Sequence, residues 1–277
     1  MKQLPFDEAW PASWQHAYLC DAAELWGSGV NLAYTYYYQA RYLSVIRAIC
    51  DSLQPGAELL DLAAAQGNFS LTLAEHGFRV TWNDLRDELE GYVRLKYETG
   101  SIRYAPGNAF EVSQFAQPQG FDGVIAAEVL EHVAHPDAFL ASVLQLVAPG
   151  GFLFLSTPNG EYLHTGLPRF SDVTDRTALE AAQFQPGSEG HLFLFTNREL
   201  QTLAEDAGFR VVSIQNLITP VLAGEFGLGK FFRFLPRGFV AGCDRALAWL
   251  SFWWRRRVML HTTAVFQRPN DLAIAAT

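Results

Sequence analysis

The stretch from residue 58 to residue 70 constrains the fold of this chain more than any other part of the sequence. Residues 59–62 are mostly apolar, residues 63–67 are small apart from Gln66, and a helical pattern begins at Asn68. A buried strand that ends in a small-residue loop and then opens a helix lets a ligand approach both the backbone and the helix N-terminus. This order predicts an α/β fold with a nucleotide-like ligand at the loop.

Further strands follow, and polar side chains stand where several of them end. Asp84 follows the second strand, about twenty residues beyond the loop, where an acid can accept hydrogen bonds from ribose hydroxyls. Asn108 follows the third strand and Glu128 the fourth. The predicted strands are residues 59–62, 79–82, 101–104, 121–127, 151–156, 209–215 and 262–267, and the predicted helices include residues 33–53, 68–75 and 197–207.

Taken together, these motifs resemble those of the class I S-adenosylmethionine-dependent methyltransferases, over roughly residues 45–215. The resemblance implies an α/β, Rossmann-like sheet of seven strands, mostly parallel with an antiparallel last strand, and helices on both faces. It also implies S-adenosylmethionine as the cofactor. The cofactor-binding residues implied in this way are Asp61, Ala63, Ala65, Gly67, Asp84, Asn108, Ala109 and Glu128.

The loop departs from the family's Asp-x-Gly-x-Gly-x-Gly pattern at two of its three glycines. Ala63 and Ala65 replace the first two, and only Gly67 is kept. Each alanine adds a Cβ atom where the family brings its backbone close to the methionine part of the cofactor. Alanine also disfavours a positive φ. The two alanines therefore make the loop less suited to any positive φ that cofactor binding needs.

The segment Glu128-Val129-Leu130-Glu131-His132, with His191 further along the chain, is the best candidate for chemistry. If a helix begins at Glu128, then Glu128, Glu131 and His132 share one face. The segment resembles two branches of the family. One is the plant small-RNA 2′-O-methyltransferases, in which two Glu and two His hold a divalent metal. The other is the ubiquinone-pathway O-methyltransferases, which share the Glu-Val-Leu-Glu-His and Ser-Thr-Pro-Asn sequences.

Three interpretations of these residues stay open. In the first, Glu128, Glu131, His132 and His191 hold Mg²⁺ or another divalent metal, which lowers the pKa of an acceptor hydroxyl. In the second, the catalytic residues are Glu128, His132 and His191, and one histidine acts as a general base without metal. In the third, the acids stabilise the positive end of a helix, and the histidines are hydrogen-bonded in a crowded interior.

Composition and charge narrow the class of protein and its partners. The chain has 277 residues, of which 49% are hydrophobic, so one domain over residues 1–277 can bury a sizeable core. Its net charge of −9 disfavours a nonspecific grip on nucleic acid. The three cysteines are widely spaced and the N-terminus lacks an apolar signal segment, so we expect a reducing, cytoplasmic location.

Three segments lie outside the predicted sheet. Residues 1–53 form an N-terminal arm, irregular up to residue 32, and a cap helix. Residues 161–190 form an insertion near the active site, and residues 218–257 an aromatic and basic insertion between the last two strands. A helix predicted at residues 242–254 either covers the sheet or contacts a second subunit, or it meets the inner face of a membrane or a lipid-bearing substrate.

These observations together predict a methyltransferase that acts on oxygen. The expected acceptor is a hydroxyl of a small molecule, a glycoconjugate sugar or a lipid-linked metabolite. Two alternatives are an RNA 2′-O-methyltransferase, against which the acidic charge argues, and a noncatalytic protein with this fold, suggested by the altered loop.

Overall fold

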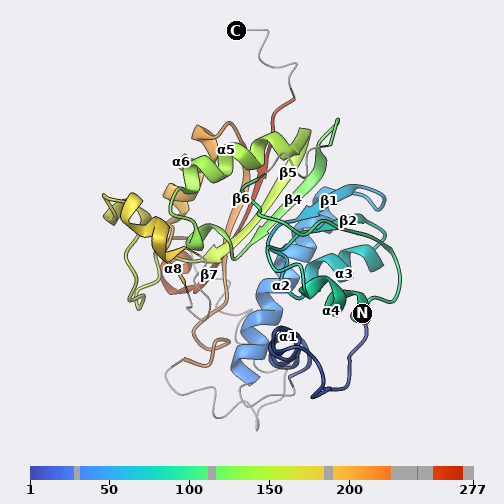
Figure 1. Cartoon of the computed structure of the whole chain (residues 1–277). Coiled ribbons are helices and arrows are strands. Elements are labelled where there is room, and N and C mark those ends of the chain that lie inside the picture. Colours follow the sequence, from blue (N-terminus) through green and yellow to red (C-terminus); the bar gives the residue numbers. More distant parts are fainter. Residues whose placement is uncertain (28–31, 112–116, 184–189, 226–241, 243–251, 271–277) are drawn as a thin grey trace.

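The computed structural model describes residues 1–27, 32–111, 117–183, 190–225, 242 and 252–270 (Figure 1). Seven strands form one sheet in the order β3-β2-β1-β4-β5-β7-β6. All pairs are parallel except those of β7, which runs antiparallel to both β5 and β6. The predicted fold class is thus confirmed. The strands are β1 Glu58–Asp61, β2 Arg79–Trp82, β3 Ser101–Tyr104, β4 Phe121–Ala127, β5 Val147–Pro158, β6 Arg210–Leu217 and β7 His261–Gln267.

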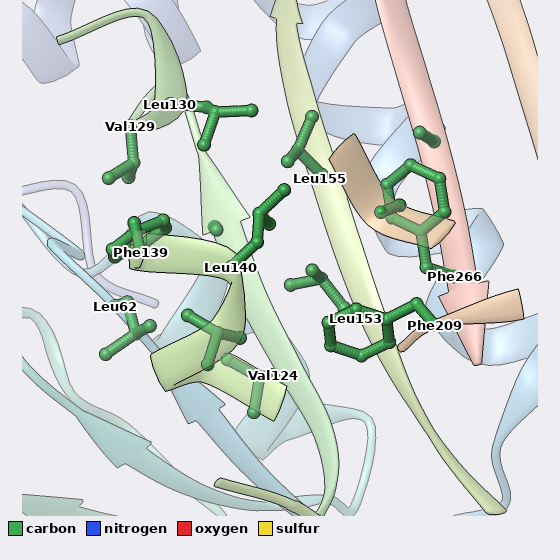
Figure 2. Packing of buried hydrophobic residues seen from close by; sticks show 14 of the residues in the cluster. Leu62, Val124, Val129, Leu130, Phe139, Leu140, Leu153, Leu155, Phe209 and Phe266 are labelled. Atoms are coloured by element: carbon green, nitrogen blue, oxygen red, sulfur yellow. The ribbon is translucent and has the colours of Figure 1, made fainter. Parts of the chain in front are cut away.

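Helices cover both faces of this sheet because successive strand residues point to opposite sides. Leu59 of β1 packs in the cluster that contains α2 and α3, whereas Leu60 packs in the cluster that contains α5 and α6. Figure 2 shows part of the second cluster, in which Leu140 of α5 lies near strand residues such as Val124 and Leu153. The α-helices are α1 Ala12–Asp21, α2 Leu32–Ser52, α3 Asn68–Glu75, α4 Leu89–Lys96, α5 Pro136–Leu146, α6 Asn197–Asp206 and α8 Phe252–Val258.

Residues 12–26 of the N-terminal arm are helical, so the prediction of an irregular arm was wrong there. Helix α1 runs directly into a π-helical turn, Ala22–Trp26. The reason lies in tertiary packing: Asp21, at the end of α1, accepts hydrogen bonds at 2.7 Å from both Tyr92 and Lys96 of α4. The same carboxylate accepts one from Asn68 at the start of α3. This buried network fixes the arm against the part of the sheet where the cofactor was predicted.

The insertion at residues 161–190 is described for the most part, whereas the insertion at residues 218–257 is described only at its two ends and at residue 242. The first contains two short 3₁₀ helices, Phe170–Asp172 and Thr177–Ala182. The predicted helix at residues 242–254 lies mainly outside the described residues. Its last residue, Trp254, is 51% exposed. Within the described ranges, no helix is long and apolar enough to cross a bilayer.

Candidate active site

The loop after β1 keeps a left-handed backbone despite its alanines. Ala63, Ala65 and Gly67 have φ angles of 51°, 47° and 72°. The loop is held in place by backbone hydrogen bonds from Ala64 to Asn83 and from Gly67 to Ala64. Both alanines thus adopt a backbone region that a side chain disfavours by roughly 1 kcal/mol or more.

Asp84 lies at the carboxyl end of β2, next to this loop. Its side chain is 4% exposed. One oxygen accepts a hydrogen bond from the Ala65 amide at 2.8 Å, and both oxygens contact the Arg86 guanidinium at 2.9 and 3.2 Å. Arg86 is half exposed. A ribose that binds Asp84 therefore has to displace a side chain that is free to move into water.

The other predicted cofactor residues surround the same edge. Asn108 Oδ1 accepts a hydrogen bond from the Phe110 amide, which closes the turn that contains Ala109. Asp61 lies beneath the loop and accepts a hydrogen bond from Ser70 at 2.6 Å. Burial raises the pKa of Asp61 to about 7, although Ser70 acts in the opposite direction. Asp61 thus joins β1 to α3 and supports the loop from below.

Glu128 departs from the predicted arrangement. It has a φ of 57°, and a 3₁₀ helix follows only at Leu130–His132, so Glu128 does not share a helix face with Glu131 and His132. Its oxygens are instead occupied: Oε2 accepts from Arg41 at 2.8 Å, and Oε1 accepts from Ser156 at 2.8 Å. Although burial opposes ionisation, Arg41 holds the pKa of Glu128 far below its usual range.

Glu131, His132 and His191 do come together, and we call these three residues the acid–histidine cluster. One ligand atom from each lies within 4.8 Å of the others. Glu131 is fully buried, and its Oε2 accepts a hydrogen bond from Thr157 at 2.9 Å. Its Oε1 has no hydrogen-bond partner among the described residues and lies 3.9 Å from His191 Nε2.

The electrostatics of the acid–histidine cluster favour the neutral forms of Glu131 and His132. Burial, helped by the nearby charge of Glu128, raises the pKa of Glu131 well above that of an exposed glutamate. Burial and the neighbouring His191 lower the pKa of His132. A protonated carboxylic acid can pass its proton to a neighbouring neutral imidazole. The carboxylate that remains can bind a cation.

Three residues that adjoin Glu128 were not among the predicted site residues. Two of them, Arg41 and Tyr37, lie one turn apart on α2. The third is His261 at the start of β7. Its Nδ1 lies 3.2 Å from the Tyr37 hydroxyl, and its Nε2 lies 3.1 Å from Glu128 Oε1. No local pattern around His261 signals this role, because its partners come from α2 and the end of β4.

With this geometry established, comparison with known proteins decides the family. A family described as "Methyltransferase domain" matches residues 34–214, which is more than half of the chain. The chain belongs to this methyltransferase family. The predicted class, an S-adenosylmethionine-dependent methyltransferase, is thus confirmed.

Relatives of the methyltransferase are similar over much of their length. The "Ubiquinone biosynthesis O-methyltransferase" of Aeromonas salmonicida (strain A449) is 30% identical over 189 residues, covering 63% of this chain and 72% of that protein. The protein of the same name from Burkholderia pseudomallei (strain 1710b) is 29% identical over 178 residues, covering 64% and 74%.

Solved structures confirm the fold of the methyltransferase. An S-adenosylmethionine-dependent methyltransferase from Mesorhizobium loti has a TM-score of 0.54 at 18% identity and covers 84% of this chain and 98% of that one. The [4+2]-cyclase SpnF has the same TM-score at 16% identity and covers 94% and 98%. Since one of these proteins is a cyclase, the fold alone does not determine the reaction.

Proposed function

We propose that this methyltransferase transfers a methyl group from S-adenosylmethionine to the hydroxyl of a small molecule, and that the acid–histidine cluster binds that hydroxyl. The observation that carries this proposal is the buried Oε1 atom of Glu131, which lacks a hydrogen-bond partner in the described structure and faces His191. Burying an oxygen atom without a hydrogen-bond partner costs free energy. The hydroxyl of the methyl-accepting molecule could donate a hydrogen bond to this oxygen.

The donor half of the proposed site consists of the loop at residues 63–67 together with Asp61, Asp84 and the turn at Asn108. The end of β4, where Glu128 is held by Arg41 and Ser156, would border the methyl group of a bound S-adenosylmethionine. Displacement of a methyl group from sulfur needs donor and acceptor aligned in one direction. The main contribution of the protein is therefore to orient the two, and to remove the hydroxyl proton.

Proton removal has two candidate routes, and the cluster fits both. In the first, His132 is the general base, which suits an imidazole whose lowered pKa keeps it neutral near pH 7. In the second, Glu131, His132 and His191 hold a divalent metal such as Mg²⁺, whose chemical contribution would be to acidify the hydroxyl. Their one-oxygen, two-nitrogen donor set suits several such ions.

Glu128 does not fit the predicted set of four metal ligands. Arg41, Ser156 and His261 surround its two oxygens, while the other three predicted ligands face one another. We therefore assign Glu128 to the positioning of Arg41 and of the strand ends. In this proposal, the metal route uses three protein ligands, which leaves coordination positions for an acceptor.

Exposed apolar side chains beside the same edge favour an acceptor with an apolar part. Leu163, Leu167 and Trp254 are 62%, 40% and 51% exposed. Leu163 follows β5, and its amide bonds to Arg257 of α8, so these segments are neighbours. The relatives named for ubiquinone biosynthesis fit such an acceptor. The predicted membrane contact through residues 225–257 falls mostly outside the described residues and stays a prediction, as do the cytoplasmic location and the glycoconjugate acceptor.

A methyl-transfer assay tests this function and separates the two routes. Purified protein is incubated with radiolabelled S-adenosylmethionine and a panel of aromatic and aliphatic hydroxyl compounds with and without apolar tails. If a metal is used, a chelator abolishes transfer and added Mg²⁺ or Mn²⁺ restores it. If His132 acts as a base, the chelator has no effect and the rate falls as His132 becomes protonated at low pH. Failure to methylate any hydroxyl, with transfer to amines instead, would contradict the proposal.

A further inference from the structure

Glu24 is a buried acid that borders the loop at residues 63–67. It lies in the π-helical turn between α1 and α2 and is 8% exposed. Its Oε1 accepts a hydrogen bond from the Tyr34 hydroxyl at 3.1 Å, and its Oε2 accepts one from Gln66 at 3.4 Å. Since Gln66 belongs to the loop, the Glu24 carboxylate lies at the edge of the proposed donor site. π-Helical turns are frequent at functional sites.

No cation within the described part of the chain forms an ion pair with Glu24. The two nearby buried cations are engaged elsewhere: Lys96 pairs with Asp21 at 2.7 Å, and Arg41 pairs with Glu128 at 2.8 Å. Burial raises the pKa of Glu24 to about 7, although Arg41 and Tyr34 act in the opposite direction. A buried carboxylate that lacks a counter-ion is stabilised when a ligand supplies one.

S-adenosylmethionine and its product S-adenosylhomocysteine both end in an amino acid, which carries an ammonium group. We propose that Glu24 binds this α-ammonium group, and the proposal rests on the donor site described above. The turn Ala22–Trp26 is well placed for this role, because the Asp21 network fixes it against α3 and α4. In this proposal, the arm contributes a charged side chain to the binding of the cofactor's amino-acid end, and the loop at residues 63–67 contributes backbone groups.

Calorimetry with two ligands tests the contact. S-adenosylhomocysteine carries the ammonium group, whereas 5′-methylthioadenosine has the same nucleoside and thioether sulfur but no amino-acid end. Glu24→Gln is expected to weaken S-adenosylhomocysteine binding about tenfold or more, as expected for loss of a charge-assisted hydrogen bond, and to change 5′-methylthioadenosine binding less than about twofold. Glu90→Gln is the matched control and is expected to change neither, because the Glu90 carboxylate, 29% exposed, pairs with Arg94 within α4.

Each other outcome has a definite meaning. If wild-type protein binds neither ligand, the proposed donor site itself is wrong. If wild-type protein binds both and Glu24→Gln weakens both equally, Glu24 only supports the fold of the arm and this inference is overturned. Unchanged binding of S-adenosylhomocysteine in Glu24→Gln overturns it as well.

A measurement on the wild-type protein covers the case in which Glu24→Gln does not fold. At pH 6 the Glu24 carboxyl is mostly protonated, so binding of an ammonium group should release close to one proton per ligand. Titrations in two buffers of different ionisation enthalpy measure this number, and no release would overturn the inference. 5′-Methylthioadenosine should release none. The charged and titratable groups that face Glu24 are Tyr34 and Arg41 of α2, Asp21 of α1 and Lys96 of α4, with Cys20 adjacent.

Discussion

The donor half and the acid–histidine cluster of this site are assembled in different ways. Donor-half residues follow the ends of β1, β2 and β3, and their contacts span short stretches of chain, as in the Ala65–Asp84 hydrogen bond over 19 positions. The region around the cluster draws on distant elements instead. Tyr37 and His261, which adjoin Glu128, are 224 positions apart. The proposed donor half is therefore built from strand–loop units that follow one another along the chain. The proposed acceptor site needs elements that are distant in sequence to pack together.

Backbone strain is present in the donor half and at its boundary with the acid–histidine cluster. Of the non-glycine residues with positive φ in the described ranges, Ala63 and Ala65 lie in the donor loop, and Glu128 lies between the two halves. Such strain persists where the surrounding structure enforces it, and it gathers at functional sites. We infer that the ends of β1 and β4 are held open for ligand at some cost to stability.

The largest expected effect lies in the acid–histidine cluster. Glu131→Gln should lower turnover by roughly 10² to 10⁴, because it removes the carboxyl group that would orient the acceptor hydroxyl beside His132 or hold a metal. Steady-state kinetics with saturating S-adenosylmethionine measure this, with the exposed Glu180→Gln as the control. An unchanged turnover would remove the cluster from the chemistry.

The same substitution, Glu131→Gln, should make the folded protein more stable at high pH. The pKa of Glu131 is higher in the folded protein than in the unfolded chain. Between these two pKa values, the folded protein keeps a proton on Glu131 that the unfolded chain has lost. Stability therefore falls as the pH rises through this interval, and Glu131→Gln should remove that loss. Urea unfolding at pH 5 and pH 8 compares the two proteins, and an equal pH dependence would contradict this reasoning.

A smaller effect is expected in the donor half. Asp84→Ala should weaken S-adenosylhomocysteine binding by about 1.5 to 3 kcal/mol, which is typical for loss of a charged hydrogen-bond partner. Arg86→Ala is the variant to compare with it, because it leaves the Asp84 carboxylate in place without its ion-pair partner. S-adenosylhomocysteine should bind this variant as tightly as the wild-type protein, or more tightly. Equal weakening by both variants would show that the ion pair, rather than the carboxylate, is what the site needs.

The smallest effect concerns the strained loop. Ala65→Gly should raise the free energy of unfolding by about 0.5 kcal/mol, since relief of roughly 1 kcal/mol of strain outweighs the added entropy of the unfolded chain. Ala64→Gly is the matched control: Ala64 has no positive φ, so the same change should destabilise by a similar amount. Urea unfolding measures both. A loss of stability in Ala65→Gly would show that this φ carries little strain.

The sequence was informative where structure depends on neighbours along the chain. Strands β2, β3 and β4 and helix α3 begin and end where apolar runs and small-residue breaks predict, and helix α6 begins at the predicted residue, Asn197. The sequence failed at Glu128, because helical spacing was assumed where the backbone turns left-handed. It also missed His261, since only pairing of β7 between β5 and β6 brings that residue to the site.

The division of the site is tested most directly by calorimetry of S-adenosylhomocysteine with the wild-type protein and with His191→Ala. We expect one molecule to bind each protein, with dissociation constants that agree within about twofold, because His191 faces the acceptor and not the donor. Turnover of His191→Ala should fall by roughly 10² or more in parallel assays. Loss of binding in His191→Ala would contradict the separation of the two halves, and absence of binding in the wild-type protein would contradict the account as a whole.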